Sequence, residues 1–186
     1  MHPLVTLAKS AVENYIKNKT IISPPKDLPT EFLERKAGVF VTLEKNGELR
    51  GCIGTYLPIR ENIAQEVIHN AISAATKDSR FPPVQIEELP YLSYTVYILS
   101  EPELVKDISE LDPKKYGIIV RNIPSPLNNK ENVAKDYFIP KTGVLLPDLN
   151  GIDTIEKQIL IACYKAGIDP EKETILIYKF TVERYK

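Results

Sequence analysis

The stretch VFVTLEKNGELRGCIG, residues 39–54, carries the strongest local folding signal in the sequence. Its centre, Asn46-Gly47, supplies the two residues of positive φ that a type I′ turn requires, so the stretch is predicted to form an antiparallel hairpin. Counting outward from this turn predicts three cross-strand pairs: Val41 with Cys52, Leu43 with Arg50, and Phe40 with Ile53. Arg50 and Cys52 are then expected on one face of the hairpin.

Hydrophobic spacing on either side of the hairpin predicts the other elements. A recurrence of apolar residues every three to four positions predicts helices over 3–18, 61–76 and 154–166, the last ended by Gly167. Alternation predicts strands over 92–99, 116–121, 143–146 and 176–183, while 122–142 is too polar for a core. Because helices and strands do not alternate as βαβ units, the predicted class is α+β, with a mainly antiparallel sheet and flanking helices.

The composition is that of a folded globular chain without a strong charge bias. Its 186 residues are 43% hydrophobic and 26% charged, enough apolar material to bury a core. A formal net charge of -1 provides no global positive field for phosphates, which argues against a non-specific nucleic-acid binder.

Two cysteines and the absence of a long apolar run favour the cytoplasm as the location. Cys52 and Cys163 lie far apart with no CxxC spacing, so we expect free thiols rather than a disulfide framework or a zinc knuckle. No apolar run approaches the ~20 residues that a bilayer requires, and we expect no signal sequence, because Met1-His2-Pro3-Leu4 leads directly into an amphipathic pattern.

Cys52 is the first candidate for chemistry. A thiolate is the reactive form of cysteine, and Arg50 on the same strand could stabilise it. Gly51 and Gly54 would leave the backbone open to a ligand. The alternative is a small buried side chain, with glycines where another element packs closely.

His69 and the segment after its helix provide the other candidates. His69 could act as a base if it meets the hairpin; the alternative is a solvated or structural histidine. Asp78 and Arg80 could bind an anion, or pair with each other and shape their loop. Cys163, on the inward face of the last predicted helix, is expected in the core, and no metal site is predicted.

Several frequent catalytic motifs are missing. The sequence has no Walker loop, dinucleotide fingerprint, GxSxG elbow or HExxH helix, so no cofactor is predicted.

Four segments in order resemble the AMMECR domain family, named for the chromosomal region of Alport syndrome, midface hypoplasia and elliptocytosis. They are LRGCIG at 49–54, HNAISAATKDSRFPPV at 69–84, GVLLP at 143–147 and CYKAGI at 163–168. The first is specific enough to be the signature of that family. Ser79 departs from the family pattern DPRFPP, and the expected GW is missing near 151–153.

The resemblance implies a single domain over 1–186 made of two parts. The larger part is expected to comprise 1–90 with 143–186, and a smaller part, 91–142, to be inserted in the middle. A cleft between them would hold the LRGCIG strand. On the matched positions the implied site comprises Arg50, Gly51, Cys52, Gly54, His69, Asp78, Arg80 and Phe81.

The family brings no established activity, and whether the chain is an enzyme is left open. Some relatives are fused to, or encoded beside, a Memo-type protein and a radical-SAM protein, which implies a shared pathway through association alone. The expected partner is a small molecule or a protein, and no association with a membrane is expected.

Three functions follow from these candidates. The first is a cleft around the LRGCIG strand that binds a ligand or partner. The second is an enzyme that uses Cys52 as nucleophile or thiol base on a small anionic substrate. The third is a scaffold for a partner protein, which would expose an apolar patch at 81–83 or 137–140.

Overall fold

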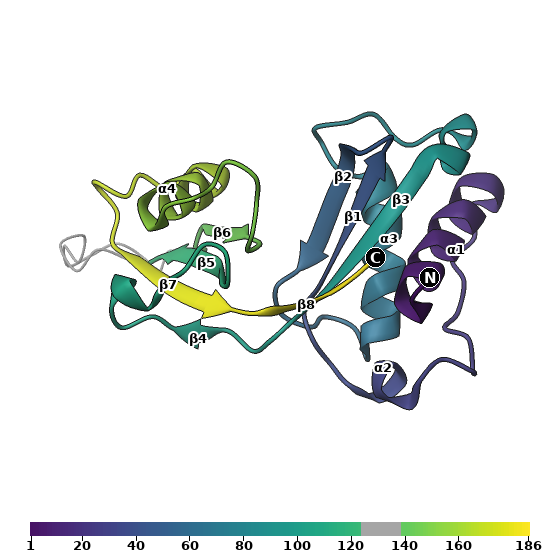
Figure 1. Ribbon diagram of the computed structural model, residues 1–186, viewed down its shortest axis with the longest axis horizontal. Coiled ribbons are helices and arrows are strands. Elements are labelled where there is room, and N and C mark those ends of the chain that lie inside the picture. The colour runs from purple at the N-terminus through teal and green to yellow at the C-terminus, as the bar shows by residue number, and fades with distance from the viewer. Residues whose placement is uncertain (124–138) are drawn as a thin grey trace, which may run out of the picture. The chain divides into compact units, whose positions relative to one another are not determined.

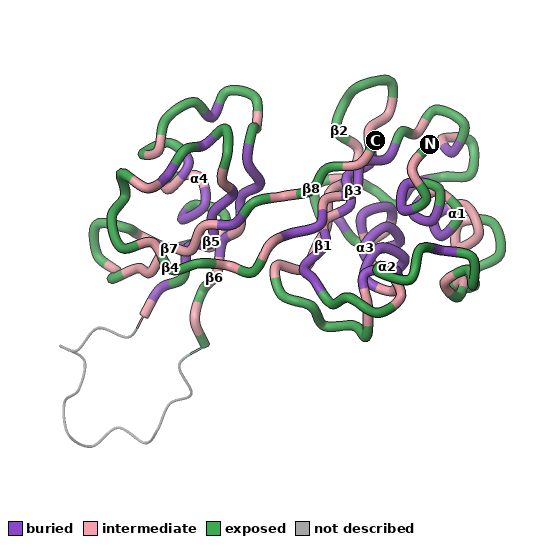
Figure 2. Tube along the Cα trace, turned by 60° about the horizontal axis from the view of Figure 1, so that its bottom comes forward, coloured by how far each residue is buried: buried purple, intermediate pink, exposed green. Residues whose placement is uncertain are grey.

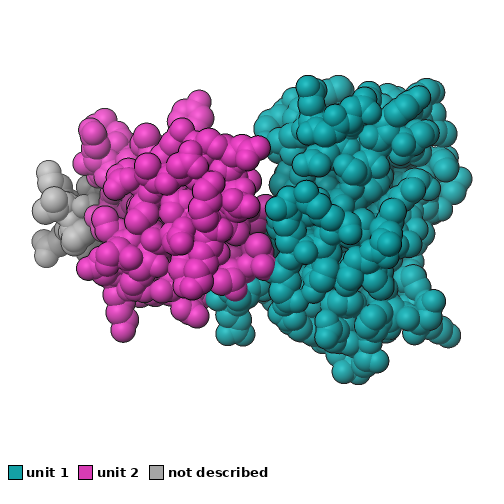
Figure 3. Space-filling view, in the orientation of Figure 1, with its two compact units in different colours: residues 1–101, 183–186 teal, residues 102–182 magenta. Residues whose placement is uncertain are grey.

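The computed structural model describes residues 1–123 and 139–186, which divide into two compact units. The first unit contains Met1–Glu101 and Glu183–Lys186, and the second contains Pro102–Val182 (Figure 3). Each unit has helices and one antiparallel sheet, so the predicted α+β class is confirmed. The part of the predicted polar segment that spans 124–138 lies outside the described residues, as do Tyr137 and Phe138 of the expected apolar patch.

The first unit is a four-stranded sheet in the order β2-β1-β3-β8 with helices packed on it (Figure 1). Its elements are α1 (Pro3–Asn18), α2 (Thr30–Glu34), β1 (Val39–Lys45), β2 (Glu48–Thr55), α3 (Ile63–Thr76), the 3-10 helix η1 (Ile86–Tyr91), β3 (Leu92–Leu99) and β8 (Val182–Tyr185). The predicted helices at 3–18 and 61–76 are confirmed, the second beginning two residues later than expected. β2 lies at the edge of this sheet.

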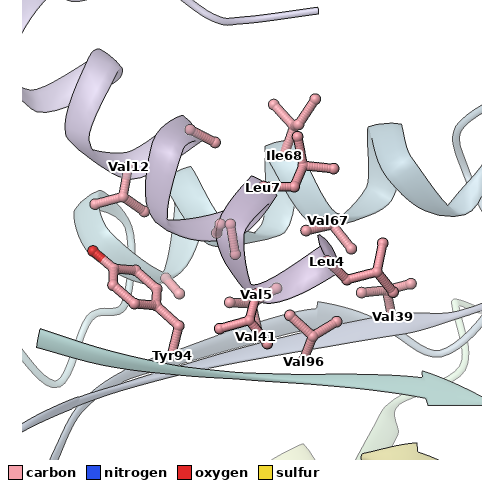
Figure 4. Packing of buried hydrophobic residues seen from close by; sticks show 14 of the residues in the cluster. Leu4, Val5, Leu7, Val12, Val39, Val41, Val67, Ile68, Tyr94 and Val96 are labelled. Atoms are coloured by element: carbon pink, nitrogen blue, oxygen red, sulfur yellow. The ribbon is translucent and has the colours of Figure 1, made fainter. Parts of the chain in front are cut away.

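The core of the first unit lies between the sheet and the helices α1 and α3. Val39, Val41 and Leu43 of β1 are fully buried in one cluster with residues of both helices, and Figure 4 shows Leu4 and Val5 of α1 directed at this layer. Because side chains alternate along a strand, Phe40 and Thr42 point to the opposite face of the sheet. The sheet therefore has a helix-covered face and a second face that carries different chemistry.

The second unit repeats this plan with fewer elements. Its sheet has the order β4-β7-β5-β6, formed by Glu103–Leu104, Ile175–Phe180, Gly117–Asn122 and Thr142–Leu145. A short 3-10 helix, η2 (Ile108–Glu110), follows β4, and α4 (Ile155–Ala166) packs against β5 and β6. The buried residues of this unit lie mainly on β5, with others on β6 and α4, whereas β4 is exposed (Figure 2).

The predicted turn is correct, but the register beyond it is not. Asn46 and Gly47 have φ values of 53° and 86°, and Lys45 pairs with Glu48 as expected. A β-bulge between Leu43 and Glu44 then shifts the register by one residue. The observed pairs are Phe40 with Gly54, Val41 with Ile53, Thr42 with Cys52, and Leu43 with Gly51, so all three predicted pairs were wrong.

The predicted sub-part boundaries also need correction. Residues 143–182 belong to the second unit rather than to the larger part, because β6 and β7 both pair with β5. The single strand predicted over 176–183 is two strands: β7 belongs to the second sheet and β8 to the first. The division into two units depends on which distant segments pair in a sheet, and the periodicity of the sequence does not indicate those pairs.

Both ends of the chain meet in the first unit through His2. Its Nδ1 accepts a hydrogen bond from the backbone N–H of Leu4 at 3.3 Å, which caps α1, and its ring stacks on Tyr185 of β8 with centroids 3.9 Å apart. Burial, followed by the positive N-terminus, lowers the pKa of His2, and Glu31 opposes this. Protonation would replace the acceptor with a donor and place a cation at the positive end of the helix.

We predict that His2 makes the stability of the first unit depend on pH. Because its pKa is lower in the folded than in the unfolded state, its contribution is present above pH ~6.5 and is lost as the pH falls through the folded value. Urea unfolding of the parent and of His2→Asn, which keeps a capping oxygen, measures this effect. The parent should lose about 0.5–1 kcal/mol that the variant does not lose; equal pH profiles would contradict the role of His2.

Candidate functional site

The LRGCIG run, residues 49–54, lies on the edge strand β2, and Cys52 points to the sheet face opposite the helices. Thr42, which alternates with the buried Val41 and Leu43, donates a hydrogen bond from Oγ1 to Cys52 Sγ at 3.1 Å. The half-buried thiol is therefore held on the second face of the sheet. A sulfur that accepts a hydrogen bond gains more from it as a thiolate than as a thiol.

Close packing explains both glycines of the run. A Cβ at Gly51 would overlap the carbonyl oxygen of Ala74 in α3, and a Cβ at Gly54 would overlap the ring of Phe40. Neither position has spare room beside its backbone in the direction of a side chain. The geometry therefore supports the alternative in which glycine is needed because another part of the structure packs closely, rather than to leave room for a ligand.

Asp78 ties the segment after α3 to the edge of β2. Its carboxylate accepts the backbone N–H of Cys52 at 2.9 Å, and it accepts Nε and Nη2 of Arg80 at 2.9 and 2.6 Å. These bonds, with that from Arg80 first, lower the pKa of Asp78 to about 2 in spite of its burial. Asp78 is therefore a charged anchor, and too weak a base to take a proton from a thiol near neutral pH.

Arg80 is oriented by Asp78 but remains accessible. Its side chain is 53% exposed, whereas that of Asp78 is 5% exposed. A guanidinium has five N–H donors, and Asp78 uses Nε–H and one from Nη2, which leaves a second edge for another acceptor. Hydrogen bonding to Asp78 raises the pKa of Arg80, and a thiolate at Cys52 would act in the same direction.

Arg50 is held by a different carboxylate. Its Nε and Nη2 donate to Oε1 and Oε2 of Glu88 in η1 at 3.0 and 2.9 Å, and Lys45 Nζ adds a third bond at 3.0 Å. These interactions, led by Arg50, lower the pKa of Glu88 to about 2. The charge of Arg50 is thus largely balanced by Glu88.

Phe81 connects the two arginines. The guanidinium carbon of Arg50 lies 5.8 Å from the centroid of its ring, and that of Arg80 lies 5.5 Å from it. Both separations fall within the range of cation–π contacts. The aromatic ring thereby limits how far Arg80 can swing while its free edge stays exposed.

His69 does not join this cluster. It lies on α3, which covers the other face of the sheet, and burial followed by the charge of Arg60 lowers its pKa, against an opposing effect of Glu66. The structure therefore brings together Arg50, Cys52, Asp78, Arg80 and Phe81 and leaves His69 apart. Among residues 1–123 and 139–186, no three His, Cys, Asp or Glu side chains form a group that could hold a metal ion.

Cys163 and Cys52 are in different environments. Cys163 is fully buried in the core of the second unit, as expected, and burial raises the pKa of its thiol. Cys52 is half-buried beside Thr42 and belongs to the first unit.

Three residues of the cluster were missed by sequence reasoning. Thr42 alternates with buried neighbours, which indicates its face of the sheet. Its pairing with Cys52, however, depends on the bulge, which was not predicted. Tyr97 lies on β3 opposite Phe40; burial raises its pKa, Arg184 and a hydrogen bond with Thr42 oppose this, and a thiolate at Cys52 would add to it. Glu88 lies 38 residues from Arg50 along the chain, and no local pattern links the two.

Comparisons with known proteins agree on one family. The AMMECR1 family model matches residues 5–185. A protein of Thermotoga maritima is 50% identical over 186 residues, covering 100% of this chain and 98% of that one. A protein of Clostridium acetobutylicum is 42% identical over 99% of this chain, which spans only 36% of that longer protein.

A solved structure supports the fold over nearly the whole chain. The crystal structure of the uncharacterised protein PH0010 from Pyrococcus horikoshii matches with a TM-score of 0.80 at 36% sequence identity. The match covers 97% of this chain and 88% of that one. In the described part of the sequence, no helix combines the length and the apolar character needed to span a bilayer.

We predict that Gly51→Ala destabilises the first unit by about 1–3 kcal/mol, because the added methyl group must displace α3 backbone. Urea unfolding measures the loss. Gly47→Asn is the matched control, since the turn position has open space and Asn tolerates positive φ, so it should cost less. Equal stability of Gly51→Ala and the parent would contradict the close approach.

Asp78 should contribute stability that acid removes. Its folded pKa is about 2, below the usual ~3.9, so its contribution is present above pH ~4 and is lost as the pH falls toward 2. Asp78→Asn should therefore cost about 1–2 kcal/mol at pH 7 and less at pH 3, the exposure of Arg80 limiting the value. A stability difference that does not change with pH would argue against the ionised anchor.

Proposed function

The chain belongs to the AMMECR1 family, and we propose that it binds an anionic ligand through Arg80 beside Cys52. Within this proposal the run LRGCIG, residues 49–54, is the family's signature, and it supplies the strand on which the site is built. The ligand would carry a carboxylate or phosphate group, because a guanidinium edge presents two parallel donors that match such groups.

The observation that carries the proposal is the state of Arg80. It is fixed on one edge by the buried Asp78, restrained by Phe81, and more than half exposed. A preorganised guanidinium loses little conformational entropy when it binds, which favours affinity. Arg50 contributes indirectly, because it also contacts the ring of Phe81 while Glu88 balances its charge.

Cys52 would form the wall of this site. Its backbone N–H and its thiol are both engaged within the cluster, by Asp78 and Thr42 respectively. An anion on the free edge of Arg80 would lie near Cys52, because the same oxygen of Asp78 accepts both the backbone N–H of Cys52 and Nη2 of Arg80. A bound ligand should therefore shield the thiol from reagents.

A second function, thiol chemistry at Cys52, has one specific observation in its favour. The Thr42 hydroxyl donates to Sγ at 3.1 Å, and Arg80 lies within electrostatic reach, so both would stabilise a thiolate. In this function the anion on Arg80 is the substrate and Cys52 the nucleophile. The base would have to come from solvent or from the substrate, because His69 is on the other side of the sheet and Asp78 is too acidic.

Protection of Cys52 from alkylation tests the binding function. Neutral iodoacetamide is reacted with the folded protein at constant ionic strength, with succinate or inorganic phosphate added, and intact-mass spectrometry follows the product. We expect saturable protection of Cys52 that disappears in Arg80→Gln and persists in Arg60→Gln. Cys163, fully buried, is the internal reference for unfolding.

Either of two results would contradict the binding function. One is an alkylation rate that neither anion changes; the other is equal protection in the parent and Arg80→Gln. The pH profile of the same alkylation reaction distinguishes thiol chemistry at Cys52 from ligand binding alone. If the pH midpoint of Cys52 alkylation lies well below ~8.5 and rises in Thr42→Val, the result favours thiol chemistry. A midpoint near ~8.5 would support the binding function without thiol chemistry.

A further inference from the structure

A hollow lies at the start of α3, on residues distinct from the Arg80 cluster. Its volume is about 400 Å³, within the range of small-molecule sites. The lining residues are Lys36, Pro58, Ile59, Arg60, Glu61 and Gln65, all in the first unit. None of them was a candidate from the sequence.

A buried carboxylate fixes the loop that forms this hollow. Glu66 is 1% exposed, and its side chain accepts the backbone N–H groups of Ile59 and Arg60 and the hydroxyl of Thr55. Asn70 donates to the same carboxylate at 3.3 Å. The loop backbone is thus held from inside, and the charged end of Arg60 remains at the surface.

The segment that carries Lys36 is attached to the same helix. The N–H of Ile63, the first residue of α3, donates to the carbonyl of Arg35 at 2.9 Å. Lys36 therefore stays next to the helix start without using its own side chain.

Two cations and one acid line the hollow, and the Glu66 carboxylate lies buried behind its loop, with its oxygens bonded to that loop. Lys36 and Arg60 are exposed, and neither forms an ion pair with a residue that the structure describes. The one acid in the lining, Glu61, accepts a hydrogen bond from Gln65 Nε2 at 3.3 Å. The helix dipole adds partial positive charge where α3 begins, and Glu66 in the first turn offsets part of it from the buried side.

We propose that this hollow binds the phosphate group of a small molecule, with Lys36 and Arg60 as the cations and Gln65 as a neutral partner. Two flexible cations can close on a tetrahedral oxyanion from a loop and a segment that are already fixed. The volume leaves room for the rest of a phosphorylated metabolite. This site is independent of the one proposed at Arg80.

His69 provides the readout for the test. It lies one helical turn beyond Gln65, on the same side of α3. Burial first, then Arg60, lowers its pKa; Glu66 opposes this and Lys77 adds to it. An oxyanion held by Arg60 should reverse part of that effect, and His2, the other histidine, is the internal reference.

The experiment is an NMR pH titration of the two histidines in the full chain, with sulfate against chloride at equal ionic strength. Sulfate stands for the phosphate group because its charge stays constant over this range. We expect sulfate to move the His69 midpoint to higher pH in a saturable manner and to leave His2 unchanged. Lys36→Gln should weaken the apparent affinity about tenfold, as loss of one charged hydrogen bond predicts, without changing the His69 midpoint in chloride.

Lys77→Gln is the matched control. It removes a cation that acts on His69 but does not line the hollow, so it should raise the midpoint in chloride and keep sulfate binding. An equal effect of chloride and sulfate would overturn the proposal, as would equal weakening by Lys36→Gln and Lys77→Gln.

Discussion

The close approach of α3 to β2 is the constraint on which both candidate sites depend. Gly51 has no room for a side chain because the backbone of α3 lies against it at Ala74, and alanines on that side of the helix allow the approach. At this separation Asn70 reaches the carbonyl of Val39, and Glu66 reaches Thr55. The residues that follow the helix then arrive at the edge of β2, where Asp78 meets Cys52.

The cluster around Cys52 shows how charges can be nearly balanced and still leave one donor surface free. Two carboxylates, Asp78 and Glu88, each hold an arginine through two nitrogen atoms, and both remain ionised to about pH 2. The two pairs differ in exposure: Arg50 is 11% exposed and Arg80 is 53% exposed. Both arginines keep a second edge outside their pair, but that of Arg50 belongs to a nearly buried side chain, whereas that of Arg80 can meet a ligand from solvent.

Local signals in the sequence predicted much of the fold and part of the site. Asn46-Gly47 located the hairpin because positive φ is a property of individual residues, and Gly167 ended α4 for the same reason. The bulge beside Leu43 belongs to the pairing of β1 with β2 rather than to any single residue, so local signals did not predict it, and it moved each predicted partner of β1 by one position. Likewise, the pairing of Arg50 with Glu88 and the place of Tyr97 depend on packing between distant segments.

The hydrogen bond from Cys52 to Asp78 has a consequence for how the molecule behaves in a crowded solution. An edge strand with free N–H groups is a template on which another chain can add a strand, and such addition is the first step of many aggregates. At Cys52 the carboxylate already occupies the place that an incoming carbonyl would take, and its charge repels other acceptors. Asp78 therefore protects the sheet from open-ended growth at the same point where it orients Arg80.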